Sequence, residues 1–195
     1  MHVAIIKYNA GNIMSVEFAL KRLGVECEVT DDFEKIKSAD KVIFPGVGEA
    51  ETTMRFLKNA KLDLLIKDLT QPVLGICLGL QLMCSYSEEG DTPCLGIFQE
   101  KVLRFEPKLK VPHMGWNTIT ELKSPLLYGL SEASYVYFVH SFYAQVGEHT
   151  IAKTNYINDF SAALNYKNFY ATQFHPEKSS DVGLSILKNF VERVV

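Results

Sequence analysis

Alternation between short apolar runs and helical patterns constrains the fold of the first half of the chain more than any other feature. The apolar runs are rich in β-branched residues and end at turn residues: His2–Lys7, Val25–Val29, Lys41–Phe44 and Pro72–Ile76. Helical spacing of apolar residues follows them, at Ser15–Leu23, at Glu49–Ile66 with a break near Asn59, and at Leu78–Tyr86. Strands that alternate with helices predict a parallel sheet covered on both faces.

The second half has a different pattern. Short strand candidates separated by turn residues occur at Leu95–Phe98, Val102–Phe105, Asn117–Thr120, Tyr135–Val139, Ile151–Thr154, Ala162–Tyr166 and Phe169–Phe174. A final helix is expected at Asp181–Val194. Because no repeat or linker interrupts the chain, we predict one α/β domain over residues 1–195. Its central sheet should be mostly parallel, with antiparallel additions in the C-terminal half.

Composition narrows the classes of function. The chain has 195 residues, 47% of them hydrophobic, which suits one sizeable core and is short for two. Its net charge of -3 and lack of a dense Lys/Arg run give no electrostatic reason for a nucleic acid or membrane partner. The N-terminus lacks a secretion signal, and no apolar run could span a bilayer. We expect a cytoplasmic protein with a small-molecule or protein partner.

The four cysteines argue against a disulfide framework and a zinc site. Cys27, Cys77, Cys84 and Cys94 form no CxxC pair and no Cys/His cluster at zinc-finger spacing. We therefore expect neither a metal nor another cofactor. A cysteine with a special role must have it through reactivity.

One cysteine lies between two glycines at a predicted strand-to-helix junction. In Gly75-Ile76-Cys77-Leu78-Gly79 a tight turn can expose Cys77, and the small neighbours leave room for the backbone. The start of a helix also favours the thiolate. Cys77 is the candidate nucleophile. The same pentapeptide also fits a buried cysteine that packs like a small apolar residue.

A thiolate that attacks a carbonyl needs a proton shuttle and a group that orients the shuttle. Both are present in His175-Pro176-Glu177, which follows the predicted strand Phe169–Phe174. If the strand continues, His175 and Glu177 point to the same side. A surface turn is the alternative interpretation of this tripeptide.

A third element ends a predicted core strand. Pro45-Gly46-Val47-Gly48 can turn backbone N–H groups toward a cleft, where Gly46, Val47 and Leu78 would form an oxyanion hole. An ordinary turn is the alternative. All three elements lie at strand ends, where α/β sheets bind ligands.

Together these motifs resemble the triad-type, class I glutamine amidotransferases over essentially the whole chain. The resemblance rests on Gly75–Met83, on His175-Pro176-Glu177 and on the upstream Pro45–Gly48 segment. More narrowly, Tyr8–Asn12, Val111–Asn117 and Gln173–Ser179 resemble the glutaminase subunits of imidazole glycerol phosphate synthases.

The resemblance implies a three-layer, flavodoxin-like fold and hydrolysis of L-glutamine to glutamate and ammonia through a cysteine thioester. In it, Cys77 attacks the side-chain amide, His175 transfers the proton and Glu177 holds His175. It also implies a set of glutamine-binding residues: Gln81, Glu89, His140, Ser141 and Phe142. A solvated acidic loop is the alternative interpretation of Glu89.

The resemblance further implies a heterodimer with a (β/α)8 cyclase of histidine biosynthesis, which receives the ammonia. Asn12, Trp116 and Lys178 would face this partner, although spacing alone predicts that Trp116 is a core residue. A glutaminase that supplies another acceptor, such as a sugar-modifying synthase, stays open. So do another Cys-dependent enzyme with the same architecture and a non-catalytic interaction module.

Overall fold

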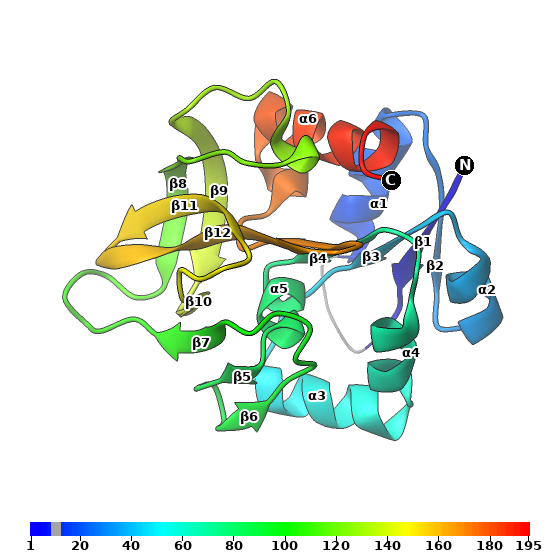
Figure 1. The fold of residues 1–195 in the computed structure, drawn as a ribbon, viewed down its shortest axis with the longest axis horizontal. Helices are drawn as coiled ribbons and strands as arrows, with labels where there is room; N and C mark the ends of the chain where they lie inside the picture. The colour runs from blue at the N-terminus through cyan, green and yellow to red at the C-terminus, as the bar shows by residue number, and fades with distance from the viewer. Residues whose placement is uncertain (9–12) are drawn as a thin grey trace.

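A seven-stranded, mostly parallel sheet forms the centre of the computed structural model, which describes residues 1–8 and 13–195 (Figure 1). The strands are β1 (His2–Ile6), β2 (Glu26–Thr30), β3 (Lys41–Phe44), β4 (Val73–Ile76), β11 (Thr150–Tyr156), β12 (Asn158–Tyr166) and β13 (Phe169–Thr172). Their order is β11-β12-β13-β4-β3-β1-β2, and the pairs from β13 to β2 are parallel. The strands β11 and β12 add antiparallel pairs at one edge, as predicted.

Helices cover both faces of this sheet. On one face lie α1 (Ile13–Arg22) and α6 (Ser180–Glu192); on the other lie α2 (Phe33–Ser38), α3 (Ala50–Asn59), α4 (Leu62–Asp68) and α5 (Leu78–Met83) (Figure 1). Alternate residues of a strand point to opposite faces of the sheet and so pack into two separate cores. In β1, Val3 and Ile5 pack with α1 and α6, whereas Ala4 and Ile6 pack with the other helices. The predicted three-layer α/β fold is confirmed, including the helix break near Asn59.

Two smaller sheets extend the second half of the described chain. One contains β5 (Tyr86–Ser87), β6 (Thr92–Pro93), β7 (Lys101–Arg104) and β10 (Phe142–Ala144), and the other pairs β8 (His113–Ile119) with β9 (Ser134–His140). Short 3-10 turns occur at η1 (Pro125–Leu127) and η2 (Pro176–Lys178). The register of β8 and β9 sets His113 opposite His140 and Trp116 opposite Tyr137.

The prediction of a strand at Leu95–Phe98 is wrong. Its backbone N–H groups donate instead to the last carbonyls of α5: Leu95 to Leu82 and Phe98 to Met83, at 2.8 and 2.9 Å. The final carbonyls of a helix have no partner inside the helix, and this segment supplies one. The same capping ends α5 at Met83, three residues before the predicted end.

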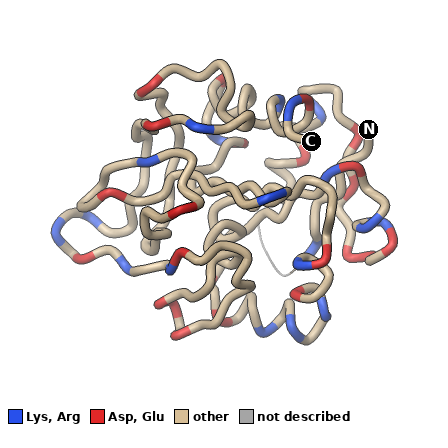
Figure 2. The backbone as a smooth tube through the Cα atoms, in the orientation of Figure 1, with Lys and Arg blue, Asp and Glu red and all other residues tan. Residues whose placement is uncertain are grey.

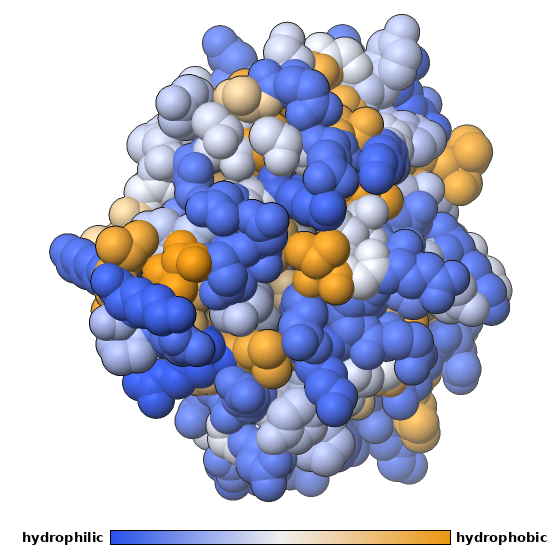
Figure 3. All heavy atoms as spheres, turned by 60° about the vertical axis from the view of Figure 1, so that its left-hand side comes forward, coloured by the Kyte–Doolittle hydropathy of each residue, from blue (hydrophilic) through white to orange (hydrophobic). Residues whose placement is uncertain are grey.

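The surface of the described chain is mixed in character. Lys and Arg are interspersed with Asp and Glu along the backbone (Figure 2), and apolar residues form separate patches on the face shown in Figure 3. Within residues 1–8 and 13–195, no helix has the length and apolar character needed to cross a bilayer.

A close contact between α6 and η2 leads to the first prediction. A Cβ atom on Gly183 would lie 1.9 Å from the Pro176 carbonyl oxygen, so Gly183→Ala must push α6 away from the turn. We expect a loss of about 2 to 3 kcal/mol in the free energy of unfolding, as for other overpacked sites. Lys188→Ala, at an exposed position of the same helix, should change it by less than about 0.5 kcal/mol. Equal urea denaturation midpoints for the two variants would contradict this contact.

Candidate functional site

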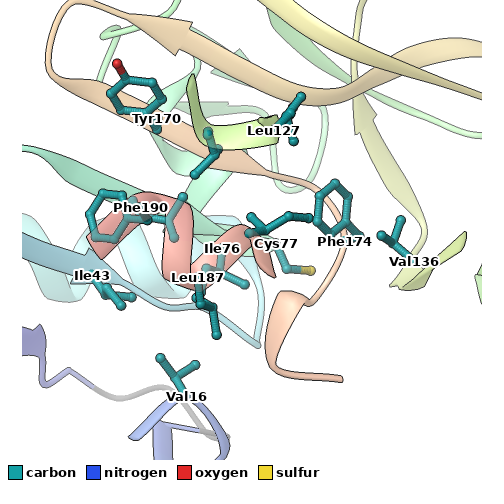
Figure 4. Packing of buried hydrophobic residues seen from close by; sticks show 14 of the residues in the cluster. Val16, Ile43, Ile76, Cys77, Leu127, Val136, Tyr170, Phe174, Leu187 and Phe190 are labelled. Atoms are coloured by element: carbon teal, nitrogen blue, oxygen red, sulfur yellow. The ribbon is translucent and has the colours of Figure 1, made fainter. Parts of the chain in front are cut away.

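Cys77 occupies a strained turn between β4 and α5. Its backbone angles are φ 53° and ψ -104°, a region that non-glycine residues rarely adopt. The flanking glycines make the turn possible: a Cβ on Gly79 would lie 2.2 Å from the Phe44 carbonyl oxygen, and one on Gly75 would lie 2.9 Å from Met83 Sδ. Figure 4 shows Cys77 beside Ile76 and Phe174 in the core cluster. The structure therefore has the nucleophile-elbow geometry that the pentapeptide predicts.

His175 and Glu177 meet, although not in the way that the sequence suggested. The distance from His175 Nδ1 to Glu177 Oε1 is 2.8 Å, and both side chains are about 1% exposed. The expected extended strand ends at Thr172, and η2 brings the two side chains together by a 3-10 turn. The surface-turn interpretation is wrong, because this turn is held inside the protein.

Strand β9 anchors this turn. The His175 backbone N–H donates to the Tyr137 carbonyl at 2.9 Å. The Ser179 hydroxyl donates to the His175 carbonyl at 2.6 Å and accepts from the Tyr137 N–H at 2.9 Å. These bonds fix the backbone of the turn against β9.

The charge balance favours a protonated His175. Burial lowers its pKa, but the negative charge of the neighbouring Cys77 thiolate and the Glu177 carboxylate, which bonds to Nδ1, together raise that pKa to about 10. Glu177 occupies Nδ1, so Nε2 is the nitrogen that faces the thiol. Such an imidazolium stabilises a neighbouring thiolate.

The other cysteines lack such an environment. Burial raises the pKa of the Cys84 thiol well above its ordinary value, and burial raises that of Cys94 to about 12. Both thiols are therefore protonated near neutral pH. Cys77 is the thiol with an adjacent base.

The candidate oxyanion residues lie together but in a closed arrangement. The Leu78 N–H donates to the Gly46 carbonyl at 3.4 Å. Because the C=O and N–H of one trans peptide point in opposite directions, the Val47 N–H of that peptide points away from Leu78. In this conformation neither donor is directed at an oxyanion. Gly48, with φ 136°, follows Val47 and adopts a backbone conformation that side chains disfavour.

A cavity of about 290 Å3 opens beside Cys77. All of the predicted glutamine-binding residues line it, and its full lining is Val47, Gly48, Cys77, Leu78, Gln81, Glu89, Pro112, Val139, His140, Ser141 and Phe142. A larger hollow of about 680 Å3 lies at the opposite end of the central strands, beside Asn168 and Phe169. The smaller cavity is the candidate site, because the reactive groups border it.

The polar groups of the cavity are fixed by contacts within the protein. Gln81 Nε2 donates to the Phe142 carbonyl at 2.9 Å and to Gln173 Oε1 at 3.2 Å. Glu89 Oε2 accepts the Ala50 N–H at 2.8 Å, and burial raises the pKa of Glu89 despite this bond. Glu89 is half-buried at the cavity wall, between the exposed Glu88 and Gly90.

Three residues near the site were missed by sequence reasoning. Gln173 Nε2 lies 3.8 Å from Cys77 Sγ, the Tyr8 hydroxyl donates to the Pro45 carbonyl, and His113 bonds to His140. Each lies within a segment that carried the family resemblance. Their roles depend on contacts between distant segments, which no local pattern reveals.

The three residues predicted to face the partner differ in what the structure shows of them. Trp116 is 52% exposed and lies edge-on to Tyr137, so the prediction from spacing that it is a core residue is wrong. Lys178 is exposed directly after Glu177. Asn12 lies outside the described residues.

The comparisons with known proteins agree with this geometry. The family model described as glutamine amidotransferase class-I matches residues 4–194. The chain belongs to this family. A relative from Bacteroides fragilis named imidazole glycerol phosphate synthase subunit HisH is 65% identical, over 98% of this chain and 100% of that protein.

A second relative agrees with this family, and a solved structure agrees with the fold. A protein of the same name from Haemophilus influenzae is 48% identical, over 100% of this chain and 98% of that protein. The solved structure of PurLQS from Thermotoga maritima has a TM-score of 0.76 at 14% identity, over 100% of this chain and 99% of that chain. The predicted family resemblance is confirmed, and so is the fold.

The buried imidazoles of His113 and His140 lead to a prediction about pH. Burial lowers their pKa values from 6.5 to about 4 and about 3. These two imidazoles therefore bind more protons in the unfolded chain than in the folded one below pH 6.5, and the stability that they contribute falls as the pH falls. Between pH 6.5 and 5.5 we expect a loss of about 2 kcal/mol in the free energy of unfolding, measured with urea. A His2→Asn control should show the same loss, and constant stability over this range would contradict neutral imidazoles.

Proposed function

We propose that the chain is the glutaminase subunit of an imidazole glycerol phosphate synthase and acts in the cytoplasm. The observation that carries the proposal is a buried His175–Glu177 pair beside Cys77, at a cavity lined by Gln81 and Glu89. Full-length relatives that carry the name of this subunit support it. Residues 1–195 act as a single glutaminase domain in this proposal.

The reaction begins from the ion pair of the Cys77 thiolate and protonated His175, which forms when the thiol proton moves to Nε2. The thiolate then attacks the side-chain carbonyl carbon of glutamine and forms a tetrahedral intermediate. When the C–N bond breaks, the imidazolium returns the proton to the leaving nitrogen, and ammonia departs. The remaining glutamyl thioester is hydrolysed by water, whose proton His175 accepts, and glutamate leaves. Glu177 stabilises the imidazolium in both steps.

The polarity of the cavity orients the substrate. Both N–H bonds of the Gln81 amide are used inside the protein, so Gln81 offers glutamine its carbonyl oxygen. This oxygen and the Glu89 carboxylate are acceptors, which suit the α-ammonium group. The α-carboxylate then lies toward Ser141 and Phe142 on the same wall.

The ammonia acceptor belongs to a second protein in this proposal. A (β/α)8 cyclase subunit forms a heterodimer with the chain and uses the ammonia to make imidazole glycerol phosphate for histidine biosynthesis. The exposed Trp116 and Lys178 support a docking face next to η2. The chain contributes only the nitrogen source.

Replacement of the nucleophile tests the proposed chemistry. In the complex with its synthase, Cys77→Ala should lower glutamine hydrolysis at least about a thousandfold. Product formation from supplied ammonium salts should continue, because the acceptor chemistry is elsewhere. Cys94→Ala, at a half-buried thiol, should retain glutamine-dependent activity. Glutamate release by Cys77→Ala at the wild-type rate would rule out the mechanism.

The closed oxyanion arrangement predicts activation by the partner. The isolated chain should hydrolyse glutamine slowly, because the Gly46 carbonyl occupies the Leu78 N–H. Binding of the synthase and its nucleotide substrate should shift the population toward the open arrangement and raise the rate on the order of a hundredfold. Steady-state assays of the chain, the complex and the complex with nucleotide measure this change. Full activity in the isolated chain would contradict it.

A further inference from the structure

Two buried histidines face each other behind the candidate site. His113 on β8 and His140 on β9 are directly paired in the register, and their side chains are buried. The distance from His113 Nδ1 to His140 Nε2 is 3.1 Å. The His113 ring stacks on Phe138 and Tyr156, at centroid distances of 4.9 and 4.0 Å. This pair takes no part in the proton transfers proposed above.

The hydrogen bonds assign the protons of both rings. His140 Nδ1 lies 2.7 Å from the Phe142 carbonyl oxygen, which can only accept, so Nδ1 carries the proton. In the neutral ring His140 Nε2 is then an acceptor, and His113 Nδ1 must donate to it. His113 Nε2 in turn accepts from Asn117 Nδ2 at 3.3 Å. The chain of donors therefore runs in one direction, from Asn117 to Phe142.

The same carbonyl connects this chain to the cavity. The Phe142 oxygen also accepts from Gln81 Nε2, which lines the cavity. Gln81 continues to Gln173, whose Nε2 lies 3.8 Å from Cys77 Sγ. The position of the Gln81 amide and the Phe142 backbone thus depends on a carbonyl that His140 holds.

We propose that His113 is a positioning residue for glutamine binding, which acts by holding the His140 ring in the orientation that bonds to the Phe142 carbonyl. The inference rests on the proposed function. Without the His113 donor, the buried His140 Nε2 is left as an unpaired acceptor, and the ring turns away from its position to reach another donor such as water. Nδ1 then no longer donates to the Phe142 carbonyl. The wall that recognises the α-amino acid end of glutamine loses its alignment.

Loss of the His113 donor should impair recognition of the substrate without impairing the chemistry of the thiol. His175 is held by Tyr137 and Glu177, outside this chain of hydrogen bonds. Loss of the His113 donor should therefore leave the reactivity of Cys77 toward a small electrophile nearly unchanged. It should weaken recognition of any ligand that carries the α-amino acid group.

The test compares two side chains at position 113 in the complex with the synthase. His113→Phe keeps a flat ring between Phe138 and Tyr156 but removes both ring nitrogens, whereas His113→Asn retains an N–H donor near the position of Nδ1. His149→Phe removes another imidazole, whose side chain is 10% exposed and pairs with Glu100 away from the Cys77 cavity. This variant is the matched control.

The measurements are KM and kcat for glutamine and the rates of covalent labelling at Cys77, located by peptide mass spectrometry. The probes are acivicin, an electrophile that carries an α-amino acid group, and iodoacetamide, which does not. His113→Phe should raise KM about tenfold and slow acivicin labelling about as much. Its iodoacetamide rate should stay within about threefold of wild type, and His113→Asn should recover most of the loss.

Several results would overturn the inference. These are an unchanged KM in His113→Phe, an equal slowing of both probes, a failure of His113→Asn to recover activity, or the same losses in His149→Phe. Failure of the proposed function is a different outcome: the wild-type complex would then neither hydrolyse glutamine nor react with acivicin at Cys77.

Discussion

The approach of Gly79 to the Phe44 carbonyl is the contact on which the site depends. No side chain fits there, since a Cβ on Gly79 would lie 2.2 Å from that oxygen. The first turn of α5 therefore rests directly on the end of β3, and Cys77 must turn through a positive φ to reach it. The strain at Cys77 is balanced by packing on both sides of the turn. This arrangement presents the thiol at the edge of the core rather than inside it.

The two halves of the chain supply different parts of the site and meet at Cys77. The parallel strands provide the turn, and the Cys77 N–H bonds to the Thr172 carbonyl of β13 at 2.7 Å. The β8–β9 pair provides the support: Tyr137 holds His175, the Val139 carbonyl lies 3.9 Å from Cys77 Sγ, and His140 holds Phe142. A change on the exposed side of the β8–β9 pair can thus affect both His175 and the part of the cavity wall that Phe142 forms.

Much of this architecture could be predicted from the sequence, because it is encoded locally. The apolar runs before Gly46 and Cys77 predicted strands of a parallel sheet, and the glycines around Cys77 predicted a tight turn. The contact between His175 and Glu177 was also predicted, although η2 produces it by a 3-10 turn. The short spacing between His175 and Glu177 limited which side chains could meet, but it did not determine the backbone path between them.

The remaining features depend on contacts between distant segments. Leu95–Phe98 has the apolar character of a strand, but the open carbonyls of α5 bind its N–H groups. Spacing alone predicts that Trp116 is a core residue, and only the folded arrangement of β8 and β9 shows that it is exposed. The partner of His113 likewise follows from the register between strands. Glycine allows the Gly46 carbonyl more than one direction, so the sequence does not predict which direction it takes.

The central claim is that Cys77 carries the glutamyl group during hydrolysis. The most direct measurement is acid quenching of the active complex during turnover of isotopically labelled glutamine, followed by mass spectrometry of every cysteine-containing peptide. The account predicts a labelled glutamyl thioester on Cys77 and no label on Cys27, Cys84 or Cys94. Turnover with label on another cysteine, or with no label on Cys77, would contradict it.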